Sequence, residues 1–390
     1  MPGLLNNVDP DGLLEYSVVY TDRAVNHMSG QFQAAMRDIH ETLTSVYNAA
    51  EMVVLPGSGT SGMEAVARQI AHDKHCLVIR NGWFSFRWSQ ILERGQIATS
   101  LTVMKGQAVQ EGRQSPFEPA PVKAVVETIR KEKPAVVFAP HVETSAGMML
   151  PNDYLKAIAA AVHDVGGLFV LDCIASGTTW VDMKATGVDV IISAPQKGWS
   201  SSPCAGLVML SEHAAQVVQE TESSSFALDL KQWQQIMRTY VSGKHAYHAT
   251  LPTDGLISFQ KIMHEIKTFG FDRAAAKQLE LGQRVRALLA EHGFVSVAAD
   301  GFHASGVVVC YTDETGIHNG SAFAKHGLQI AAGVPLRIDE PDDYKSFRIG
   351  LFGIDKLTDV DGAVKRFEQA LKAVAAEKTG ASPATEKRAA

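Results

Sequence analysis

The sequence has little of what membrane, secreted and nucleic-acid-binding proteins usually carry. Its 390 residues include four cysteines and no C-x-x-C pair, so we expect neither a disulfide framework nor a thiolate metal site. No apolar run reaches the roughly 18 residues that a membrane span needs, and the first residues lack the basic and apolar segments of a signal peptide. The net charge is -6 and basic residues form no long block, which argues against nucleic acid or an anionic membrane as a partner. We expect a cytoplasmic protein that acts on small molecules.

Histidine spacing does not predict a metal site either. The sequence contains two H-x-x-H pairs, His72 with His75 and His245 with His248. The histidines of a helical zinc site are usually spaced i, i+4, and neither pair has a third ligand nearby in the sequence. We therefore expect no bound metal.

Short apolar runs alternate with amphipathic segments from about residue 52 to residue 209. Such alternation is typical of strands and helices in a mainly parallel sheet that helices cover on both faces. The sequence therefore predicts an α/β protein. The expected strands are MVVLP (52–56), CLVIR (76–80), AVVFA (135–139), GLFVLD (167–172), DVIISA (189–194) and GLVML (206–210).

The pattern of apolar residues changes near residue 250, where a turn-rich passage, KHAYHATLPTDG, precedes long helical patterns and fewer strands. A chain of this length usually forms more than one domain, so we place a boundary there. The polar ending EKTGASPATEKRAA is low in complexity and is expected to be flexible. The predicted parts are an N-terminal arm (1–24), a large α/β domain (25–252), a small C-terminal α+β domain (253–378) and a flexible tail (379–390).

A glycine-rich loop, PGSGTSGMEA, follows the first expected strand and opens a helix. Gly57, Gly59 and Gly62 match G-x-G-x-x-G, which is typical of a dinucleotide-binding loop. In that fold an acidic residue ends the second strand and holds the ribose. Arg80 and Asn81 occupy this place here, which weakens the dinucleotide hypothesis and leaves a cofactor with a 2′-phosphate as its remaining form.

Two other interpretations of this loop stay open. Ser61 and Glu64 fit a capping box, S-x-x-E, in which the glycines only let the loop pass close to the sheet. Alternatively, Gly59, Thr60 and Ser61 offer backbone N–H groups and hydroxyls to one phosphate dianion at the positive end of the helix. The last two interpretations are compatible, because a capped helix still has free N–H donors.

Two charged residues follow neighbouring apolar strands. Asp172 ends the run FVLD, and Lys197 comes after DVIISAPQ in a loop made mostly of Gly, Ser and Pro. The carboxyl ends of parallel strands border the ligand crevice, so we expect both side chains at the same edge of the sheet. A buried carboxylate there needs a cationic partner, and a plain Asp172–Lys197 ion pair is one possible outcome.

Pyridoxal phosphate explains more of these features at once. Its aldehyde bonds to a lysine amine, a carboxylate keeps its pyridine nitrogen protonated, and a helix N-terminus suits its phosphate. A free lysine, with a pKa near 10.4, is a poor nucleophile at neutral pH, so a desolvated and partly cationic pocket favours its reactive form. On this hypothesis Lys197 also moves a proton at the substrate α-carbon, while Asp172 keeps the ring electron-poor.

Several motifs, taken in order, resemble the class V, fold-type I aminotransferases of the alanine-glyoxylate and serine-glyoxylate type. They are GSGTSGMEA, NGWFSFR, HVETSAG, LDCIAS, SAPQKG, YHAT and FRIGLFG. The likeness runs from about Val25 to the last expected helix, and it implies pyridoxal 5′-phosphate as the cofactor. It also implies the fold of that family, in which a large domain is built on a mainly parallel sheet and a smaller α+β domain follows.

The resemblance implies a set of cofactor contacts. Lys197 would carry the cofactor through an imine, and Asp172 would pair with the ring nitrogen. Ser145 would lie near the phenolic oxygen. Phe84 would stack on the ring where the family usually has tryptophan, and Trp83, one residue away, stays an alternative. The residues implied for the phosphate are Gly59, Thr60, Ser61 and Gln196.

Three further positions match functional residues of the family. Tyr247 and Thr250, in YHAT, match residues that reach the phosphate of the neighbouring subunit, so a homodimer with shared active sites is implied. Arg348, in FRIGLFG, matches the arginine that binds the substrate carboxylate, a task that suits a planar guanidinium.

The expected reaction moves an amino group from a small amino acid, alanine-like or serine-like, to a small 2-oxo acid, glyoxylate or pyruvate. Family members usually begin with a Pro-Gly-Pro stretch beside the substrate pocket, whereas this chain has VDPDGLLEYSVVYTDRAVNHMSG, so the amino donor is not determined. The alternatives are a pyridoxal-phosphate-dependent lyase or desulfurase, an NADP-dependent oxidoreductase and a binding protein without activity. A desulfurase needs a reactive cysteine, and we expect Cys204 and Cys310 to be buried thiols.

Overall fold

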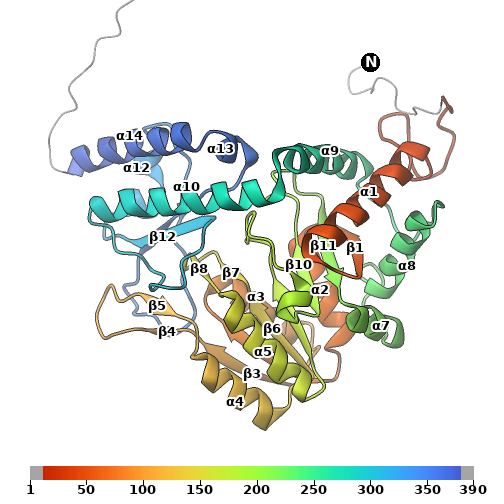
Figure 1. The fold of residues 1–390 in the computed structure, drawn as a ribbon, viewed down its shortest axis with the longest axis horizontal. Helices are drawn as coiled ribbons and strands as arrows, with labels where there is room; N and C mark the ends of the chain where they lie inside the picture. Colours follow the sequence, from red (N-terminus) through yellow and green to blue (C-terminus); the bar gives the residue numbers. More distant parts are fainter. Residues whose placement is uncertain (1–11, 379–390) are drawn as a thin grey trace, which may run out of the picture.

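A seven-stranded sheet forms the centre of the computed structural model, which describes residues 12–378 (Figure 1). The strand order is β1-β11-β10-β9-β6-β2-β3, in which β11 runs antiparallel to both of its neighbours and every other pairing is parallel. The mainly parallel α/β sheet that the sequence predicts is therefore confirmed. Its strands are β1 (Glu51–Pro56), β2 (His75–Arg80), β3 (Ser100–Lys105), β6 (Val136–Pro140), β9 (Leu168–Asp172), β10 (Val190–Ser193) and β11 (Ala205–Leu210).

The expected strands form within about one residue of their predicted ends, but β3 was not predicted. β3 lies at the edge of the sheet, and each of its residues is at least partly exposed. An edge strand that is only half covered does not need a continuous apolar run, so its pattern is weak in the sequence. By contrast, β6, β9 and β10 are buried along their whole length, which requires cover on both faces of the sheet.

Helices pack on this sheet and against one another. α2 contacts β10 and β11, α3 contacts β2 and β6, and α5 contacts β9. α1 and α8 contact β1, and α9 packs against α1. The helices of this part are α1 (Gly30–Tyr47), α2 (Gly59–Ile70), α3 (Trp83–Arg94), α4 (Val122–Glu132), α5 (Asn152–Asp164), α6 (Met183–Thr186), α7 (Glu212–Glu220), α8 (Leu230–Val241) and α9 (Thr253–Phe269).

A smaller sheet of three antiparallel strands, in the order β12-β14-β13, lies beside the large one. The long helix α10 packs against β12 and α14 (Figure 1). The strands β4–β5 and β7–β8 form two short ribbons. The remaining elements are β4 (Gln107–Ala108), β5 (Phe117–Glu118), β7 (Val142–Glu143), β8 (Met148–Met149), α10 (Phe271–Glu291), β12 (Val307–Tyr311), α11 (Thr315–His318), α12 (Ser321–Ala324), β13 (Ala331–Ala332), β14 (Ser346–Gly350), α13 (Ile354–Thr358) and α14 (Val360–Lys378).

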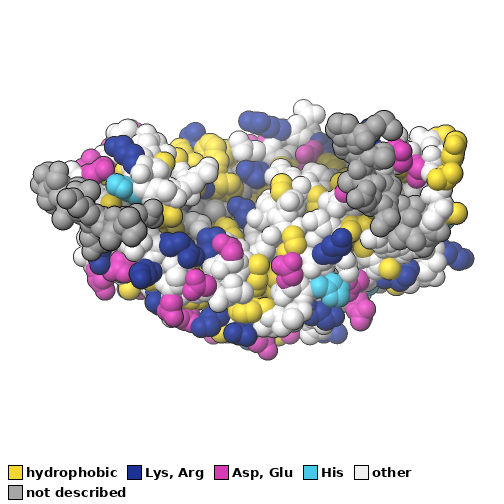
Figure 2. All heavy atoms as spheres, turned by 90° about the horizontal axis from the view of Figure 1, so that it is seen from above, with side chains coloured by type: hydrophobic (Ala, Val, Ile, Leu, Met, Phe, Trp, Pro, Cys, Tyr) yellow, Lys and Arg dark blue, Asp and Glu magenta, His cyan; other side chains and the backbone are white. Residues whose placement is uncertain are grey.

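The predicted domain boundary near residue 252 stays a prediction. The predicted tail (379–390) and the first part of the predicted arm (1–11) lie outside the described residues. On the face seen in Figure 2, side chains of both charge signs are interspersed. Within residues 12–378, no helix combines the length and the apolar character needed to cross a membrane.

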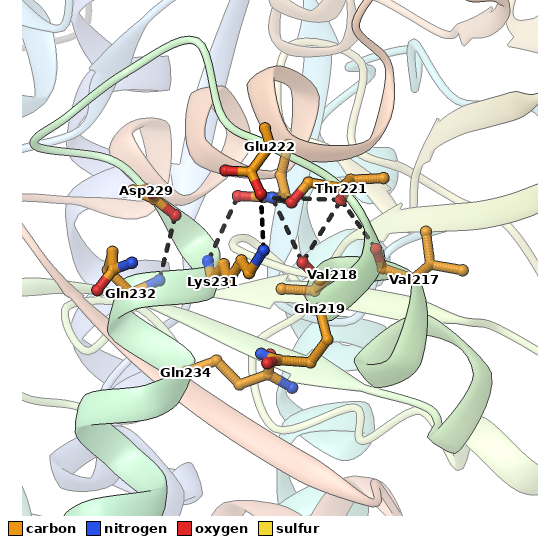
Figure 3. A network of polar contacts seen from close by, with 10 residues as sticks. Val217, Val218, Gln219, Thr221, Glu222, Asp229, Lys231, Gln232 and Gln234 are labelled. Atoms are coloured by element: carbon orange, nitrogen blue, oxygen red, sulfur yellow. Dashed lines mark hydrogen bonds and ion pairs between the residues drawn. The ribbon is translucent and has the colours of Figure 1, made fainter.

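A polar network ties the segment between α7 and α8 to α2 (Figure 3). Lys231 Nζ donates to Glu222 Oε1 at 2.7 Å, and Asp229 caps the first turn of α8. Gln69 of α2 donates through Nε2 to the carbonyl oxygen of Thr221 at 2.9 Å. These contacts fix the start of the helix that leads into the YHAT segment.

Candidate active site

Asp172 and Lys197 come from neighbouring parallel strands. Asp172 is the last residue of β9, and Lys197 lies in the loop that follows β10. Because the two strands are parallel, both residues leave the sheet at its carboxyl edge. The Asp172 side chain lies in the interior, with the residue 8% exposed, and the backbone N–H of Ile174 donates to its Oδ1 at 2.9 Å.

Burial raises the pKa of the Asp172 carboxyl to about 7. The negative charge of Glu143 adds to this rise, whereas the hydrogen bond from Ile174 and the positive charges of Arg87 and Lys197 oppose it. A carboxyl held in this state ionises more readily when a further cation comes next to it. The edge of β9 is therefore suited to a ligand with a protonated nitrogen.

The loop that carries Lys197 is closely held. The Ser200 N–H donates to the Lys197 carbonyl at 3.0 Å, and the Ser201 N–H donates to the Pro195 carbonyl at 2.9 Å. Lys197 Nζ lies 5.2 Å from the centroid of the Phe352 ring. The lysine is thus directed toward the segment that follows β14.

Burial lowers the pKa of the Lys197 amine, and the positive charges of Arg348 and Arg87 lower it further. Asp172 acts in the opposite direction. A lysine in such a place loses its proton more readily than a solvated lysine and becomes a better nucleophile and base.

Helix α2, which follows the glycine-rich loop, starts before Ser61, the residue that the capping-box interpretation takes as its N-cap. α2 begins at Gly59 with Ser58 as the N-cap residue, and Ser61 Oγ accepts from the Ser58 N–H at 3.2 Å. Glu64 instead pairs with Arg68 at 2.8 Å. The predicted Ser61–Glu64 capping box is therefore wrong, because Glu64 lies too far along the helix to reach its N-cap.

The first turn of α2 packs directly on the two loops of the site. A Cβ atom on Gly59 would lie 2.5 Å from Ile174 Cδ1 and 3.3 Å from the Cβ of Ala194. Ile174 follows Asp172, and Ala194 precedes the Lys197 loop. Gly59 thus lets the N-terminal end of a helix, which attracts anions, approach the ends of β9 and β10 closely.

Arg87 belongs to the same site, although sequence reasoning did not select it. Its Nη1 donates to Thr60 Oγ1 at 3.0 Å, and its Cζ lies 5.3 Å from the centroid of the Phe84 ring. Arg348 Cζ lies 5.5 Å from the same ring. Trp83, the alternative to Phe84, lies instead beneath Arg337, at 5.4 Å. Arg87 is the last residue of the motif NGWFSFR, and this position was the signal in the sequence that could have identified it.

A hydrogen bond to the backbone of the neighbouring strand β13 orients the Arg348 side chain. Its Nε donates to the Ala332 carbonyl at 2.8 Å, and within residues 12–378 no hydrogen bond occupies Nη1 or Nη2. Burial lowers the pKa of this guanidinium, and the charge of Glu143 opposes the change. The two terminal nitrogens are thus left for a carboxylate, which a planar guanidinium binds through parallel hydrogen bonds.

Glu143, a second residue that sequence reasoning missed, caps α3. Its fully buried carboxylate accepts hydrogen bonds from the N–H groups of Phe84 and Ser85 at 3.1 and 2.8 Å. The Ser145 hydroxyl donates to it at 2.7 Å and accepts from the Trp83 N–H at 2.9 Å. A hydroxyl has one proton, so Ser145 has none left for a cofactor oxygen in this arrangement.

The other predicted residues lie in two places. The Gln196 side chain is next to Lys197 in sequence, and its buried Oε1 has no hydrogen-bond partner among the described residues. Tyr247 and Thr250 are exposed and bond to each other, Oη to Oγ1 at 3.1 Å. They lie near His27, whose ring is 5.5 Å from that of Tyr247.

The residues at the carboxyl edge fit pyridoxal phosphate. The N-terminus of α2, together with Arg87, makes a positive place for a phosphate dianion. Asp172 is a buried carboxyl without a full cationic partner, and Lys197 is a desolvated amine. The buried Oε1 of Gln196, an acceptor without a partner among the described residues, is the kind of atom that a hydrogen-bond donor on a bound ligand satisfies.

The chain is similar to known proteins along most of its length. A family model described as aminotransferase class-V matches residues 13–334. A protein named soluble hydrogenase, small subunit, from Synechococcus sp. is 26% identical over 354 residues, which span 89% of this chain and 87% of that protein. Alanine–glyoxylate aminotransferase 1 of Saccharomyces cerevisiae is 26% identical over 355 residues, 85% of this chain and 86% of that protein. The crystal structure of an alanine–glyoxylate aminotransferase from Nostoc sp. covers 89% of each chain with a TM-score of 0.74 and 19% identity.

These findings decide between the cofactors that the glycine loop left open. The Nostoc structure shares the fold, and the family model spans the glycine loop, Asp172 and Lys197. The dinucleotide hypothesis for Gly57, Gly59 and Gly62 is therefore set aside. The chain belongs to the class V aminotransferase family and is a pyridoxal-phosphate-dependent transaminase of fold type I.

Proposed function

We propose that this protein transfers an amino group from a small amino acid, such as alanine or serine, to a small 2-oxo acid, such as glyoxylate or pyruvate. The observation that carries the proposal is the convergence of Lys197, Asp172, Arg87 and Arg348, whose charges act on one another at the carboxyl edge of the sheet. The relatives named alanine–glyoxylate aminotransferase support this choice of donor and acceptor. We place the reaction in the cytoplasm, where the four free thiols would stay reduced.

Several residues of this chain hold the cofactor in the proposal. When bound, pyridoxal phosphate supplies an aldehyde that condenses with amines and a ring that accepts electrons from the substrate α-carbon. The first turn of α2, with Gly59, Thr60 and Ser61, binds the phosphate, and Gln196 donates to it through its side-chain NH₂ group. Arg87 adds positive charge there through its hydrogen bond to Thr60. Phe84 offers an aromatic face between the α3 terminus and Arg348.

Lys197 and Asp172 have different proton tasks. The lowered pKa of Lys197 increases the fraction of free amine near neutral pH, and in that form Nζ removes the proton from the substrate α-carbon. Asp172, whose pKa burial raises to about 7, ionises more readily beside a cation and so holds the proton on a heterocyclic nitrogen. Arg348 binds the substrate carboxylate through Nη1 and Nη2 and so sets which substituent of the α-carbon faces Lys197.

A homodimer with shared sites completes the proposal. Tyr247 and Thr250 are exposed and make no hydrogen bond to the Lys197 loop within the described residues. The adjacent arm presents Leu14, Tyr16 and Val18, all strongly exposed, the tyrosine at 90%. Exposed apolar side chains of this kind mark a contact surface, and we propose that a second copy covers them and receives Tyr247 and Thr250 at its phosphate site.

The desulfurase alternative receives little support from the cysteines. Cys310 lies buried in β12, and burial raises the pKa of its thiol to about 12. Cys204 is partly buried, with its pKa raised to about 11. Thiols that stay protonated at neutral pH are poor nucleophiles. The remaining alternative is a lyase that needs no reactive cysteine. Its reaction products distinguish it from a transaminase.

The first experiment tests Lys197. The purified wild-type protein should show a visible absorbance that borohydride removes, and Lys197→Ala should lack both this signal and turnover. Lys261→Ala, at an exposed position on α9, serves as the matched control and should behave like the wild type. Normal turnover of the Lys197→Ala protein would overturn the proposal.

The second experiment identifies the substrates. Alanine and serine are offered as donors, each with glyoxylate, pyruvate or 2-oxoglutarate as acceptor, and the new amino acid is measured. A transaminase needs both partners, whereas a lyase releases ammonia, sulfide or pyruvate from the amino acid alone. Release without an added oxo acid at the rate of the full reaction contradicts the transaminase assignment.

A further inference from the structure

A pocket of about 480 Å³ opens beside the site at the ends of the outer strands. Its walls include Arg80 and Lys105, the last residues of β2 and β3, and part of the segment 335–344 that precedes β14. Neither Lys197 nor Asp172 lines it. The pocket therefore lies outside the residues assigned to the cofactor.

The guanidiniums of two arginines of this pocket lie over aromatic rings. Arg80 Cζ lies 4.6 Å from the centroid of the Phe86 ring, and Arg337 Cζ lies 5.4 Å from that of Trp83. Arg80 Nη2 also donates to Ser89 Oγ at 2.8 Å. A cation–π contact of this kind restrains a guanidinium while its N–H groups can still donate hydrogen bonds.

The acidic side chains of the pocket form no ion pair with these two arginines among the described residues, although the charge of Asp339 acts on Arg80 and opposes the fall of its pKa. Asp339 pairs with Lys105 at 2.6 Å. Glu340 accepts hydrogen bonds from the backbone N–H groups of the three residues Leu336, Arg337 and Ile338, at 2.7 to 3.0 Å. Within residues 12–378, neither Arg80 nor Arg337 forms an ion pair, although burial lowers the pKa of Arg80. Asp342, which is exposed, is the third carboxylate of the wall.

The loop that carries Arg337 is held in an unusual conformation. Arg337 and Asp339 both have positive φ angles, 66° and 67°, which residues other than glycine rarely adopt. Glu340 and the Lys105–Asp339 ion pair hold this loop in place. Such strain persists only where surrounding contacts enforce it, and it is concentrated at functional sites.

The pocket is adjacent to the proposed substrate arginine. Tyr344 lines it, and its buried hydroxyl lies next to that of Ser346. Tyr344 immediately precedes the segment that enters β14 (Ser346–Gly350), the strand that carries Arg348. Trp83 and Phe84, neighbours in the first turn of α3, face Arg337 and Arg348 respectively.

We propose that this pocket binds the anionic group, a carboxylate or phosphate-type group, of a small molecule between the guanidiniums of Arg80 and Arg337. The group has two possible sources. It is either the second acidic group of a substrate whose first carboxylate is bound by Arg348, or part of a separate ligand. The first alternative rests on the proposed function, and the second is independent of it.

The test uses inorganic phosphate as the probe and the cofactor-loaded protein in phosphate-free buffer at constant ionic strength. Titration calorimetry should detect phosphate binding to the wild type. Arg337→Gln should weaken it by about tenfold or more, because a charged hydrogen-bond partner is lost. Arg337 is exposed, so this variant should fold normally, and Arg80→Gln gives a second reading. Arg130→Gln, an exposed arginine of α4 paired with Asp164, is the matched control and should bind phosphate like the wild type.

Steady-state kinetics then separate the two sources. If phosphate and Arg337→Gln each raise the KM for aspartate as donor more than that for alanine, the pocket receives the second acidic group of a substrate. If phosphate binds but neither KM changes selectively, the pocket serves a separate ligand. The proposal is overturned if the wild type does not bind phosphate, or if Arg337→Gln and Arg80→Gln both bind it as the wild type does. Absence of the visible absorbance from the wild type would instead contradict the proposed function and would leave the proposal for this pocket unaffected.

Discussion

Asp172 and Lys197 sit at the ends of neighbouring strands, and packing removes most of the water from both side chains. Desolvation favours the neutral form of both the carboxyl and the amine, because the charged form of each loses its hydration. The two groups are thus held ready for a partner that carries charge. The same desolvation makes the stability of the cofactor-free protein depend on pH.

We expect the free energy of unfolding of the cofactor-free protein to fall as the pH rises from about 4 to about 7. The pKa of Asp172 rises from 3.8 to about 7 on folding, so in this range the folded chain keeps a proton that the unfolded chain has released. At about 1.4 kcal/mol per pKa unit, the contribution is at most roughly 4 kcal/mol. Urea unfolding at pH 4.5 and pH 7.5 measures it.

Asp172→Asn should remove this part of the pH dependence, because an amide does not titrate. Asp153→Asn, at an exposed position in the first turn of α5, is the control and should keep the wild-type dependence. An Asp172→Asn protein whose stability varies with pH as in the wild type would show that the carboxyl is not desolvated as described.

At the scale of elements, the start of α3 depends on one carboxylate from a different segment. Glu143, at the end of β7, accepts hydrogen bonds from the first-turn N–H groups of Phe84 and Ser85. The first N–H groups of a helix have no partner within it, and a carboxylate at this end also interacts favourably with the helix dipole. Because Phe84 and Arg87 lie in the same helix, this cap positions both.

Glu143→Gln should destabilise the protein by about 1–3 kcal/mol, because the amide NH₂ would face buried donors and leave one of them unpaired. It should also weaken cofactor binding, since the first turn of α3 loses its anchor. Denaturant unfolding and titration with pyridoxal phosphate measure the two effects. Glu127→Gln, on the exposed face of α4, should change neither. Equal stability of the two variants would contradict the capping role.

The Lys197 loop offers a second test at this scale. A Cβ on Gly198 would collide with the backbone carbonyl of Gly177, which has no flexible end to turn away. Gly198→Ala should therefore displace the loop, lower stability by about 1–3 kcal/mol and reduce cofactor absorbance. In Gly316→Ala the new Cβ finds its nearest atom at 3.6 Å, within a helix where alanine is favoured, so this variant should fold and bind the cofactor normally. Normal absorbance of Gly198→Ala would contradict the close packing.

At the scale of the whole molecule, the proposed dimer makes a prediction about mixed subunits. If Tyr247 and Thr250 act in the site of the partner, a hybrid of a Lys197→Ala chain and a chain with Tyr247→Ala and Thr250→Ala has one intact site. Such a hybrid, purified with two different tags, should recover about half of the wild-type activity. Each parent homodimer should be nearly inactive.

The arrangement of the substitutions supplies the control. When all three substitutions are placed in one chain and the partner is wild type, a shared-site dimer has no intact site, whereas independent subunits keep one. Activity in this second hybrid, with none in the first, would contradict shared sites. A sedimentation mass equal to that of one chain would contradict the dimer itself.

Local sequence was enough to predict the main sheet and the chemical types at its edge. The apolar runs that become β6, β9 and β10 are buried on both faces, which is why their pattern is strong, and the half-exposed β3 was missed for the opposite reason. Motif order pointed to Lys197, Asp172 and Arg348. It did not select Arg87 or Glu143, because their importance comes from contacts with Thr60 and with the start of α3.

The sequence by itself determined the order of strands and helices, the glycine that lets α2 approach the sheet, and the presence of an amine and a carboxyl after neighbouring strands. Only the tertiary structure decided which charges meet there, in which direction burial shifts the pKa of Asp172 and Lys197, and that Arg80 and Arg337 lie over aromatic rings without an ion pair among the described residues. The physical reason is that strand and helix patterns come from neighbours along the chain, whereas desolvation and charge act through space between residues that are far apart in sequence.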